Sequence, residues 1–371
     1  MQRFPFFLLL STVMLVAWGA LAPRGAAVAH SVEGIDVDTA AAAPDTSVDV
    51  IAYFCKRDTT CYTYEHSRIK IKGGDTTVMS SVQEEFYVTV LDSTAQGYRM
   101  EFCPTSIVFP DATAGDSIDF SSMLTLLAKN MVGRKIVFTL SPEGKLEHIK
   151  NWKALRRELK DGFKHMIDSV FNRLPQLDTV FDRASVYDLV TAQYDSEEDV
   201  INSLGELSLL FSCHGLSFPL TADSTIVIDD DPDATMPQQV ALNTGILGAD
   251  DVDPFDEMGE YDYYIDLRTH TDLPPSMISL VLKSTMALLG DSEKGSAEVT
   301  KGFDDAVKGM KDLKCNGDGR SVISYSVNGW PKHIVETKQV EVTGTQDGKS
   351  LRESRIDLKS IDWSSRSWFN F

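Results

Sequence analysis

Apolar and polar residues alternate along many short stretches of this chain, which is the period expected of strands. In residues 82–92, VQEEFYVTVLD, the side chains of Val82, Phe86, Val88 and Val90 share one face. Similar stretches occur near 50–56, 61–72, 97–103, 134–140, 145–150, 224–229, 259–269, 319–327, 332–343 and 352–362. Glycine-containing turns such as PEGK and VNGW separate several of them, so we expect antiparallel hairpins.

Apolar residues spaced three or four apart predict helices between the groups of strands. Helices are expected at 151–174, 195–211 and 275–290, with weaker candidates at 117–131 and 292–313. Ser196 is the expected N-cap of the second helix, because acidic residues follow it in the first turn.

Segregated runs of strands and helices favour an α+β fold over an alternating parallel sheet. We expect strongly curved antiparallel sheets, or a half-barrel, with helices packed on them. The chain divides into a signal peptide (1–29), a flexible leader (30–49), an N-terminal α+β half (50–220), an acidic connection (221–258) and a C-terminal α+β half (259–371).

The N-terminus has the order of a secretory signal peptide. One arginine, Arg3, precedes an apolar run from Phe4 to Ala22, and a small-residue site ends at Ala29. The alternative is a retained anchor, since about 19 apolar residues can just span a bilayer. With cleavage after Ala29 and no second span-length run, we expect a periplasmic or secreted protein, with outer-membrane association left open.

Acidic residues concentrate in one part of the chain. The net charge is −20, and residues 184–267 hold 19 Asp and Glu without a Lys or Arg. Such a segment repels phosphate backbones and argues against nucleic-acid binding. Asp229, Asp231 and Asp233 have the spacing that opens a calcium loop, but Ala234 replaces the glycine that the turn needs. A solvated acidic loop is the simpler interpretation.

The chain has five cysteines, so at least one thiol is free or pairs between chains. Cys55 and Cys61 are the expected disulfide in an exported protein. A zinc site from this pair and His66 fits no usual ligand spacing.

Two segments share Gly-x-x-x-His-Ile: GKLEHI (144–149) and GWPKHI (329–334). Longer segments, 133–149 and 319–334, align as two strand–turn–strand units, so a duplicated unit is one hypothesis and chance is the other. A catalytic or metal pair of His148 and His333 has no supporting neighbours in the sequence.

No nucleophile, metalloprotease or nucleotide-binding motif occurs in the chain. The adjacent Cys213 and His214 do not by themselves make the spatial pair that a thiol nucleophile needs. We expect no catalytic residue, cofactor or metal, and regard an enzyme as the less favoured class.

The stretch from Gly144 to Trp152, a strand that runs into a helix beginning Asn-Trp, resembles uncharacterised secreted proteins of Bacteroidota-type bacteria. The arrangement of sheet and helices is similar to half-barrel carriers related to lipoprotein-localisation factors. The second resemblance implies a curved sheet that cups a lipid beneath helices.

Two functions follow. One is an exported, non-enzymatic protein that binds a lipid or other apolar small molecule in a pocket between sheet and helices. The other is an envelope module that binds a protein partner through the acidic segment or the aromatic C-terminal strand. A hydrolase without a recognisable motif comes third.

Overall fold

The computed structural model describes residues 47–72, 75–110, 131–173, 175, 178, 182–221, 225–231, 238–247, 262–273, 314–343 and 348–362.

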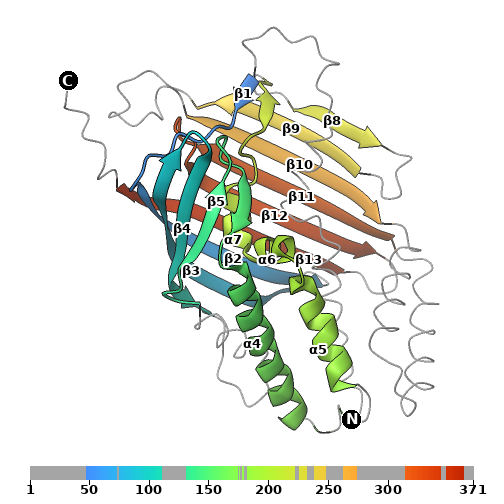
Figure 1. The fold of residues 1–371 in the computed structure, drawn as a ribbon. Coiled ribbons are helices and arrows are strands. Elements are labelled where there is room, and N and C mark those ends of the chain that lie inside the picture. The colour runs from blue at the N-terminus through green and yellow to red at the C-terminus, as the bar shows by residue number, and fades with distance from the viewer. Residues whose placement is uncertain are drawn as a thin grey trace.

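One large antiparallel sheet organises these residues (Figure 1). Its strands are β2 (Thr59–Lys72), β3 (Asp75–Thr94), β4 (Gly97–Val108), β5 (Ile136–Leu140), β6 (Leu146–Ile149), β8 (Ile226–Asp231), β9 (Gln238–Ile246), β10 (Tyr263–Leu273), β11 (Lys314–Tyr325), β12 (Pro331–Thr343) and β13 (Gly348–Asp362). Their order in the sheet is β6-β5-β4-β3-β2-β13-β12-β11-β10-β9-β8, so β6 and β8 are edges and the sheet is not closed.

The sheet joins the two predicted halves of the chain. Strands β2 to β6 run outward from the centre in sequence order, and β8 to β13 run inward from the other edge. The halves meet where β2 pairs with β13, with Tyr64 opposite Ile356. Figure 1 shows β3 to β6 crossing in front of the other strands, so the sheet is strongly curved. A separate pair, β1 (Ser47–Asp49) and β7 (Ser217–Pro219), lies beside it.

The described helices fall between β6 and β7. They are α4 (Trp152–Arg173), α5 (Arg183–Thr191), the 3-10 turn η3 (Ala192–Tyr194), α6 (Glu197–Ser203) and α7 (Gly205–Leu210). The prediction for 151–174 is confirmed by α4. The helix predicted at 195–211 is split at Leu204, but Ser196 caps α6 as expected, in a reciprocal capping box with Asp199.

The fold is mostly β, which corrects the expected balance of an α+β protein. Strands are longer than their alternating patterns indicated: β3 alone has 20 residues. The helices predicted at 117–131, 275–290 and 292–313 lie outside the described residues. No helix in the part of the chain that the structure describes is long and apolar enough to cross a bilayer.

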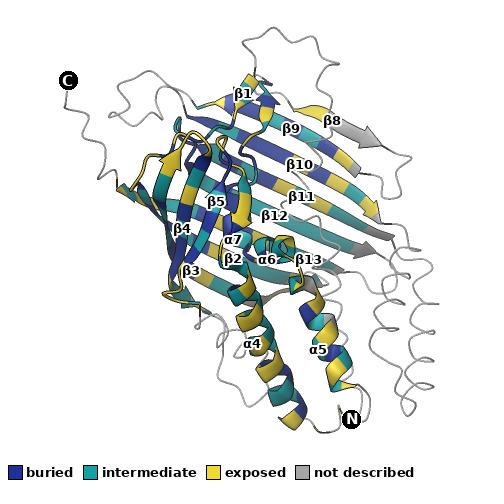
Figure 2. Cartoon of the chain, viewed as in Figure 1, coloured by how far each residue is buried: buried dark blue, intermediate teal, exposed yellow. Residues whose placement is uncertain are grey.

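The core lies between one face of the sheet and α6 and α7. Ile334 and Ile356 on the strands and Leu207 and Leu210 on α7 are at most 1% exposed and belong to one cluster. We call this the helix-bearing face, and the other the opposite face. Figure 2 shows buried residues concentrated where the strands meet these helices, with half-buried residues farther along β11 to β13.

Two glycine-containing turns contact residues 51–53, the segment that enters the core before β2. The backbone N–H of Ala52 donates to the carbonyl of Glu143 at 3.0 Å, and that of Tyr53 donates to Asn328 at 3.0 Å. Gly144 and Gly329 in these turns have φ of +100° and +82°, and a Cβ on either would lie under 3 Å from residues 51–52 or His214. Glycine is therefore required at both turns.

These turns belong to the two hairpins that share Gly-x-x-x-His-Ile. Their glycines play comparable roles against the same segment, but β6 leads into α4 whereas β12 leads into β13. The duplication therefore stays a hypothesis.

Candidate ligand-binding face

The helix-bearing face changes character along its strands. At the covered end, directly opposed residues on five adjacent strands form an apolar row: Tyr64, Ile356, Ile334, Ile323 and Ile265. Each is at most 9% exposed. Helix α7 packs beside this row and lies against β12. The row is a continuous apolar surface across the middle of the sheet.

Four residues farther along each strand, the same face carries cations. Arg68 on β2 lies directly opposite Arg352 on β13, and Arg352 lies opposite Lys338 on β12. With a rise of about 3.3 Å per residue, this cationic row lies roughly 13 Å from the apolar row. All three side chains are half-buried.

Only part of this positive charge is neutralised within the described structure. Glu336 binds Lys338 at 3.1 Å, and these side chains are 12% and 22% exposed. Neither Arg68 nor Arg352 makes a hydrogen bond or ion pair with any residue that the structure describes. Burial and the neighbouring Arg352 lower the pKa of Arg68 to about 10. Burial also lowers the pKa of Arg352, and it outweighs the opposing effect of the Glu336 charge.

His66 lies between the apolar and cationic rows. Its Nδ1 is 3.0 Å from the hydroxyl of Ser354 on the neighbouring strand. Burial, followed by the nearby charges of Arg352, Arg68 and Lys338, lowers the pKa of His66 to about 4. The imidazole is therefore neutral at physiological pH.

A carboxyl pair joins the sheet to α7. Glu84 on β3 lies opposite Tyr64 and is 8% exposed, and its carboxyl interacts with that of Glu206 in the first turn of α7. Burial, and then the like charge of Glu206, raise the pKa of Glu84 to about 9. The pair therefore holds a proton at neutral pH.

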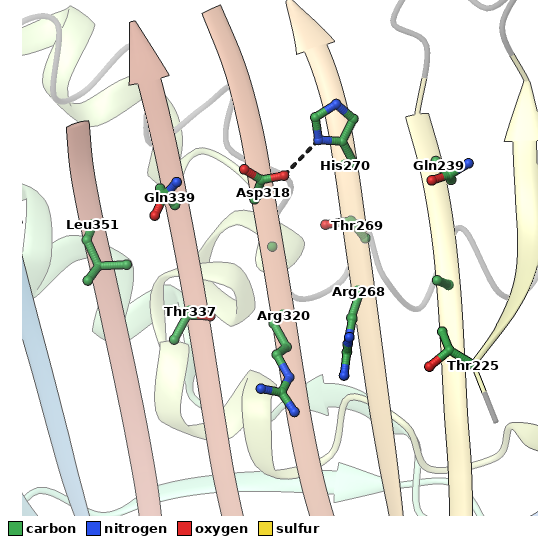
Figure 3. A pocket seen from close by; sticks show the side chains of 12 residues that line it. Thr225, Gln239, Arg268, Thr269, His270, Asp318, Arg320, Thr337, Gln339 and Leu351 are labelled. Carbon is green, nitrogen blue, oxygen red and sulfur yellow. Dashed lines mark hydrogen bonds and ion pairs between the residues drawn. The ribbon is translucent and has the colours of Figure 1, made fainter. Parts of the chain in front are cut away.

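The opposite face holds a polar hollow of about 530 Å³ (Figure 3). Its lining comes from β9 to β13 and the residue before β8: Thr225, Gln239, Ala241, Arg268, Thr269, His270, Asp318, Gly319, Arg320, Thr337, Gln339 and Leu351. His270 Nδ1 is 2.7 Å from the carboxylate of Asp318, which Figure 3 marks.

Charges in this hollow are paired. Arg268 and Arg320 both donate to Asp266, with their nearest nitrogens at 2.9 Å from its carboxylate. Burial alone would raise the pKa of Asp266, but hydrogen bonds from Arg320 and Arg268 outweigh it and lower the pKa. The arginines of this hollow are therefore neutralised by a carboxylate within the same face.

The two histidines of the shared motif do not meet. His148 is on β6, at one edge of the sheet, 3.5 Å from Glu197. His333 is on β12 near the middle and binds Asp357 at 2.5 Å. Each is a strand histidine with its own carboxylate, and no catalytic pair forms.

Cys213 and His214 are core residues. Burial raises the pKa of Cys213 to about 11 and lowers that of His214 to about 4. His214 lies between aromatic rings and its Nε2 donates to the carbonyl of Gly329 at 2.9 Å. A neutral thiol beside a neutral imidazole that is already bonded lacks an activated nucleophile.

The remaining candidate residues are placed as follows. Cys55 is exposed before β2 and Cys61 is partly buried within it; both are free thiols here, so their disulfide stays a prediction. Asp229 and Asp231 end β8, where the structure does not describe the side chains, and Asp233 lies outside the described residues. Among the described residues, no cluster of three His, Cys, Asp or Glu could hold a metal ion.

Comparison with known proteins leaves the family open. No protein-family model matches the chain, and no curated protein matches it in sequence. Among solved structures, one described as lipid–protein interactions in lipovitellin is similar over 83% of this chain, with 10% sequence identity and a TM-score of 0.37. The matched part spans 26% of that chain. This distant likeness does not establish a shared function, and neither resemblance noted from the sequence is confirmed.

Proposed function

We propose that the protein is an exported, non-enzymatic binding protein that holds a lipid or other apolar ligand against the helix-bearing face of the large sheet. One observation carries the proposal: an apolar row crosses five strands on this face, and the same face continues past α6 and α7 as half-buried strand surface.

Within the described residues, the helical cover of this face is small, which supports this function. Helices α6 and α7 have seven and six residues, and they cover only one end of strands that have 12 to 15 residues. Such a cover can shift while the sheet, held by its own backbone ladder, stays intact. An apolar ligand could then replace contacts between the helices and the sheet.

The titrating groups on this side of the sheet are poorly suited to catalysis. A general acid or base works best with a pKa near the operating pH. The pKa values of His66 and His214, about 4, and of Cys213, about 11, lie far from neutrality. The pKa of Glu84, about 9, lies nearer, but its carboxyl is buried against that of Glu206. Their shifts come mainly from burial, which suits a binding surface better than an active site.

Export rests on the N-terminal pattern and is part of the proposal. Expression of the full chain in a bacterium with a periplasm, followed by N-terminal sequencing, tests it. We expect a periplasmic product that begins at His30. A cytoplasmic product that retains Met1 would remove export from the proposed function.

Ligand binding is tested on protein purified without detergent. Native mass spectrometry should show adducts of lipid mass, and organic extraction should release them. The delipidated protein should then bind dodecanol in a fluorescence-displacement assay. A clean apo mass together with no dodecanol binding would contradict the proposal.

A further inference from the structure

We propose that Arg68, Arg352 and Lys338 form a binding site for the anionic group of an amphipathic ligand, a phosphate or a carboxylate. The proposal rests on the function above for the ligand's apolar part, whereas the anion site itself rests on the three cations.

The position of the cations is the first argument. Directly opposed residues on antiparallel strands have Cβ atoms about 5 Å apart, and like charges in such pairs destabilise a sheet. Here three cations occupy successive opposed positions on β2, β13 and β12. A sequence that breaks a local rule without internal compensation commonly does so at a functional site.

The missing internal partner is the second argument. On the opposite face, Arg355 lies on the same strand as Arg352 and binds Asp357 at 2.6 Å. Arg68 and Arg352 make no hydrogen bond or ion pair with a carboxylate among the described residues; Glu336, whose charge acts to raise the pKa of Arg352, is bound to Lys338. The described row therefore has three positive charges and one negative charge, and an anion would supply the missing partner.

The chemistry of guanidinium groups defines the ligand class. Two arginines side by side can each donate two parallel hydrogen bonds to the oxygens of a phosphate or carboxylate. Half-burial strengthens these bonds, because the effective dielectric constant is lower than in water. The apolar row lies about 13 Å away on the same face, which is within the length of a 12-carbon chain and indicates the direction of an apolar tail.

The test compares three probes on delipidated full-length protein: dodecyl phosphate, dodecanol and inorganic phosphate. Titration calorimetry at about 50 mM salt and below the micellar concentration limits electrostatic screening. We expect dodecyl phosphate to bind at least tenfold more tightly than either other probe.

Substitutions then assign the charge contribution to the two arginines. Arg68→Gln and Arg352→Gln should each weaken dodecyl phosphate binding about tenfold, as the loss of a charge-assisted hydrogen bond predicts, and leave dodecanol binding unchanged. Arg355→Gln is the matched control on the opposite face, and it should change the affinity for neither dodecyl phosphate nor dodecanol. Melting temperatures of unliganded Arg68→Gln and Arg352→Gln should equal or exceed that of the wild type, which excludes misfolding as the cause.

The outcomes separate the anion site from the proposed function. The anion site would be overturned if dodecanol and dodecyl phosphate bound with equal affinity. It would also be overturned if Arg352→Gln and Arg355→Gln lost the same affinity for dodecyl phosphate. Either result would leave lipid binding standing. Alternatively, inorganic phosphate could bind as tightly as dodecyl phosphate and depend equally on Arg68. This result would support the anion site, but it would identify a free anion as the ligand and contradict lipid binding. Failure of all three probes to bind would overturn both.

A second readout comes from His66. An anion held by the neighbouring cations favours the imidazolium form and so raises the pKa of His66 from about 4. Proton NMR titration with and without dodecyl phosphate should show this rise. An unchanged pKa in the saturated complex would contradict the placement of the anion.

Discussion

On the opposite face of the sheet, Arg268 and Arg320 both bind the carboxylate of Asp266. On the helix-bearing face, Arg68 and Arg352 lie side by side and make no hydrogen bond or ion pair with a described residue. Both arrangements belong to one sheet, the first on β10 and β11 and the second on β2 and β13. They lie on opposite faces because alternate residues of a strand point to opposite faces. Paired charges keep one face soluble at little cost. Unpaired, half-buried charges weaken the other unless something binds them.

The largest expected difference between the faces concerns packing. Ile334→Ala removes a fully buried side chain from the apolar row, and should lower the free energy of unfolding by about 2–5 kcal/mol. Val335→Ala, its neighbour on the opposite face, should cost no more than about 1 kcal/mol. Urea unfolding of both variants measures the difference; equal losses would mean that the core does not lie on the helix-bearing face.

The second prediction concerns the paired charges of the opposite face. The carboxylate of Asp266 is 6% exposed and neutralises two half-exposed arginines, and Asp266→Asn removes its charge. We expect a loss of about 1–3 kcal/mol at pH 7, the value of charge-assisted hydrogen bonds. Because the folded-state pKa of Asp266 is lowered, this stabilisation is present above its unfolded pKa and is lost as pH falls. The cost of the substitution should therefore hold from pH 7 down to about pH 4 and shrink below the unfolded pKa of 3.8 in chemical denaturation. A cost that stays constant below that pH would refute the ion-pair account.

The third prediction concerns a carboxyl on the helix-bearing face, where substitution should raise the free energy of unfolding instead of lowering it. Glu84 has its pKa raised from 4.5 to about 9, so the folded state holds a proton that the unfolded state releases between these values. Stability contributed by this proton is present at low pH and is lost as pH rises through that window. Glu84→Gln should thus stabilise the protein by about 1–2 kcal/mol at pH 8 and have little effect near pH 4.

The exposed Glu353 on the opposite face provides the control for this experiment. Glu353→Gln should leave the pH dependence of unfolding unchanged. If Glu84→Gln destabilises the protein at pH 8, the two carboxyls do not share a proton in the way we describe.

The smallest expected effect is the change in stability of the unliganded protein. Arg68→Gln removes a repulsion from Arg352 and should raise the free energy of unfolding by up to about 1 kcal/mol. Arg355→Gln removes a half-exposed ion pair and should lower it by up to about 1 kcal/mol. Changes of opposite sign in the free energy of unfolding would support the contrast between the faces. A lower free energy of unfolding in Arg68→Gln would show that this arginine has a structural partner.

The sequence predicted local structure better than it predicted the site. Alternation located most of the strands, spacing located α4, and Ser196 was correctly identified as an N-cap, because these depend on neighbours in the chain. Two strand predictions were wrong: residues 50–56 form no strand, and β9 lies in the segment expected to be an acidic connection. Sheet order was not predictable, since β2 and β13 pair across almost 300 residues. The alternation of His66, Arg68 and Lys70 along β2 was visible, but a cationic row appears only when Arg352 and Lys338 are placed beside it.

Photolabelling tests the central claim, that the ligand lies on the helix-bearing face, most directly. Delipidated protein is irradiated with a dodecyl phosphate that carries a diazirine in its chain, and labelled residues are located by mass spectrometry. We predict labels on alternate residues of β12, at Glu336, Lys338 and Val340, that an excess of unlabelled dodecyl phosphate removes. Labels on Val335, Thr337 and Gln339 instead would place the ligand on the opposite face and contradict the account.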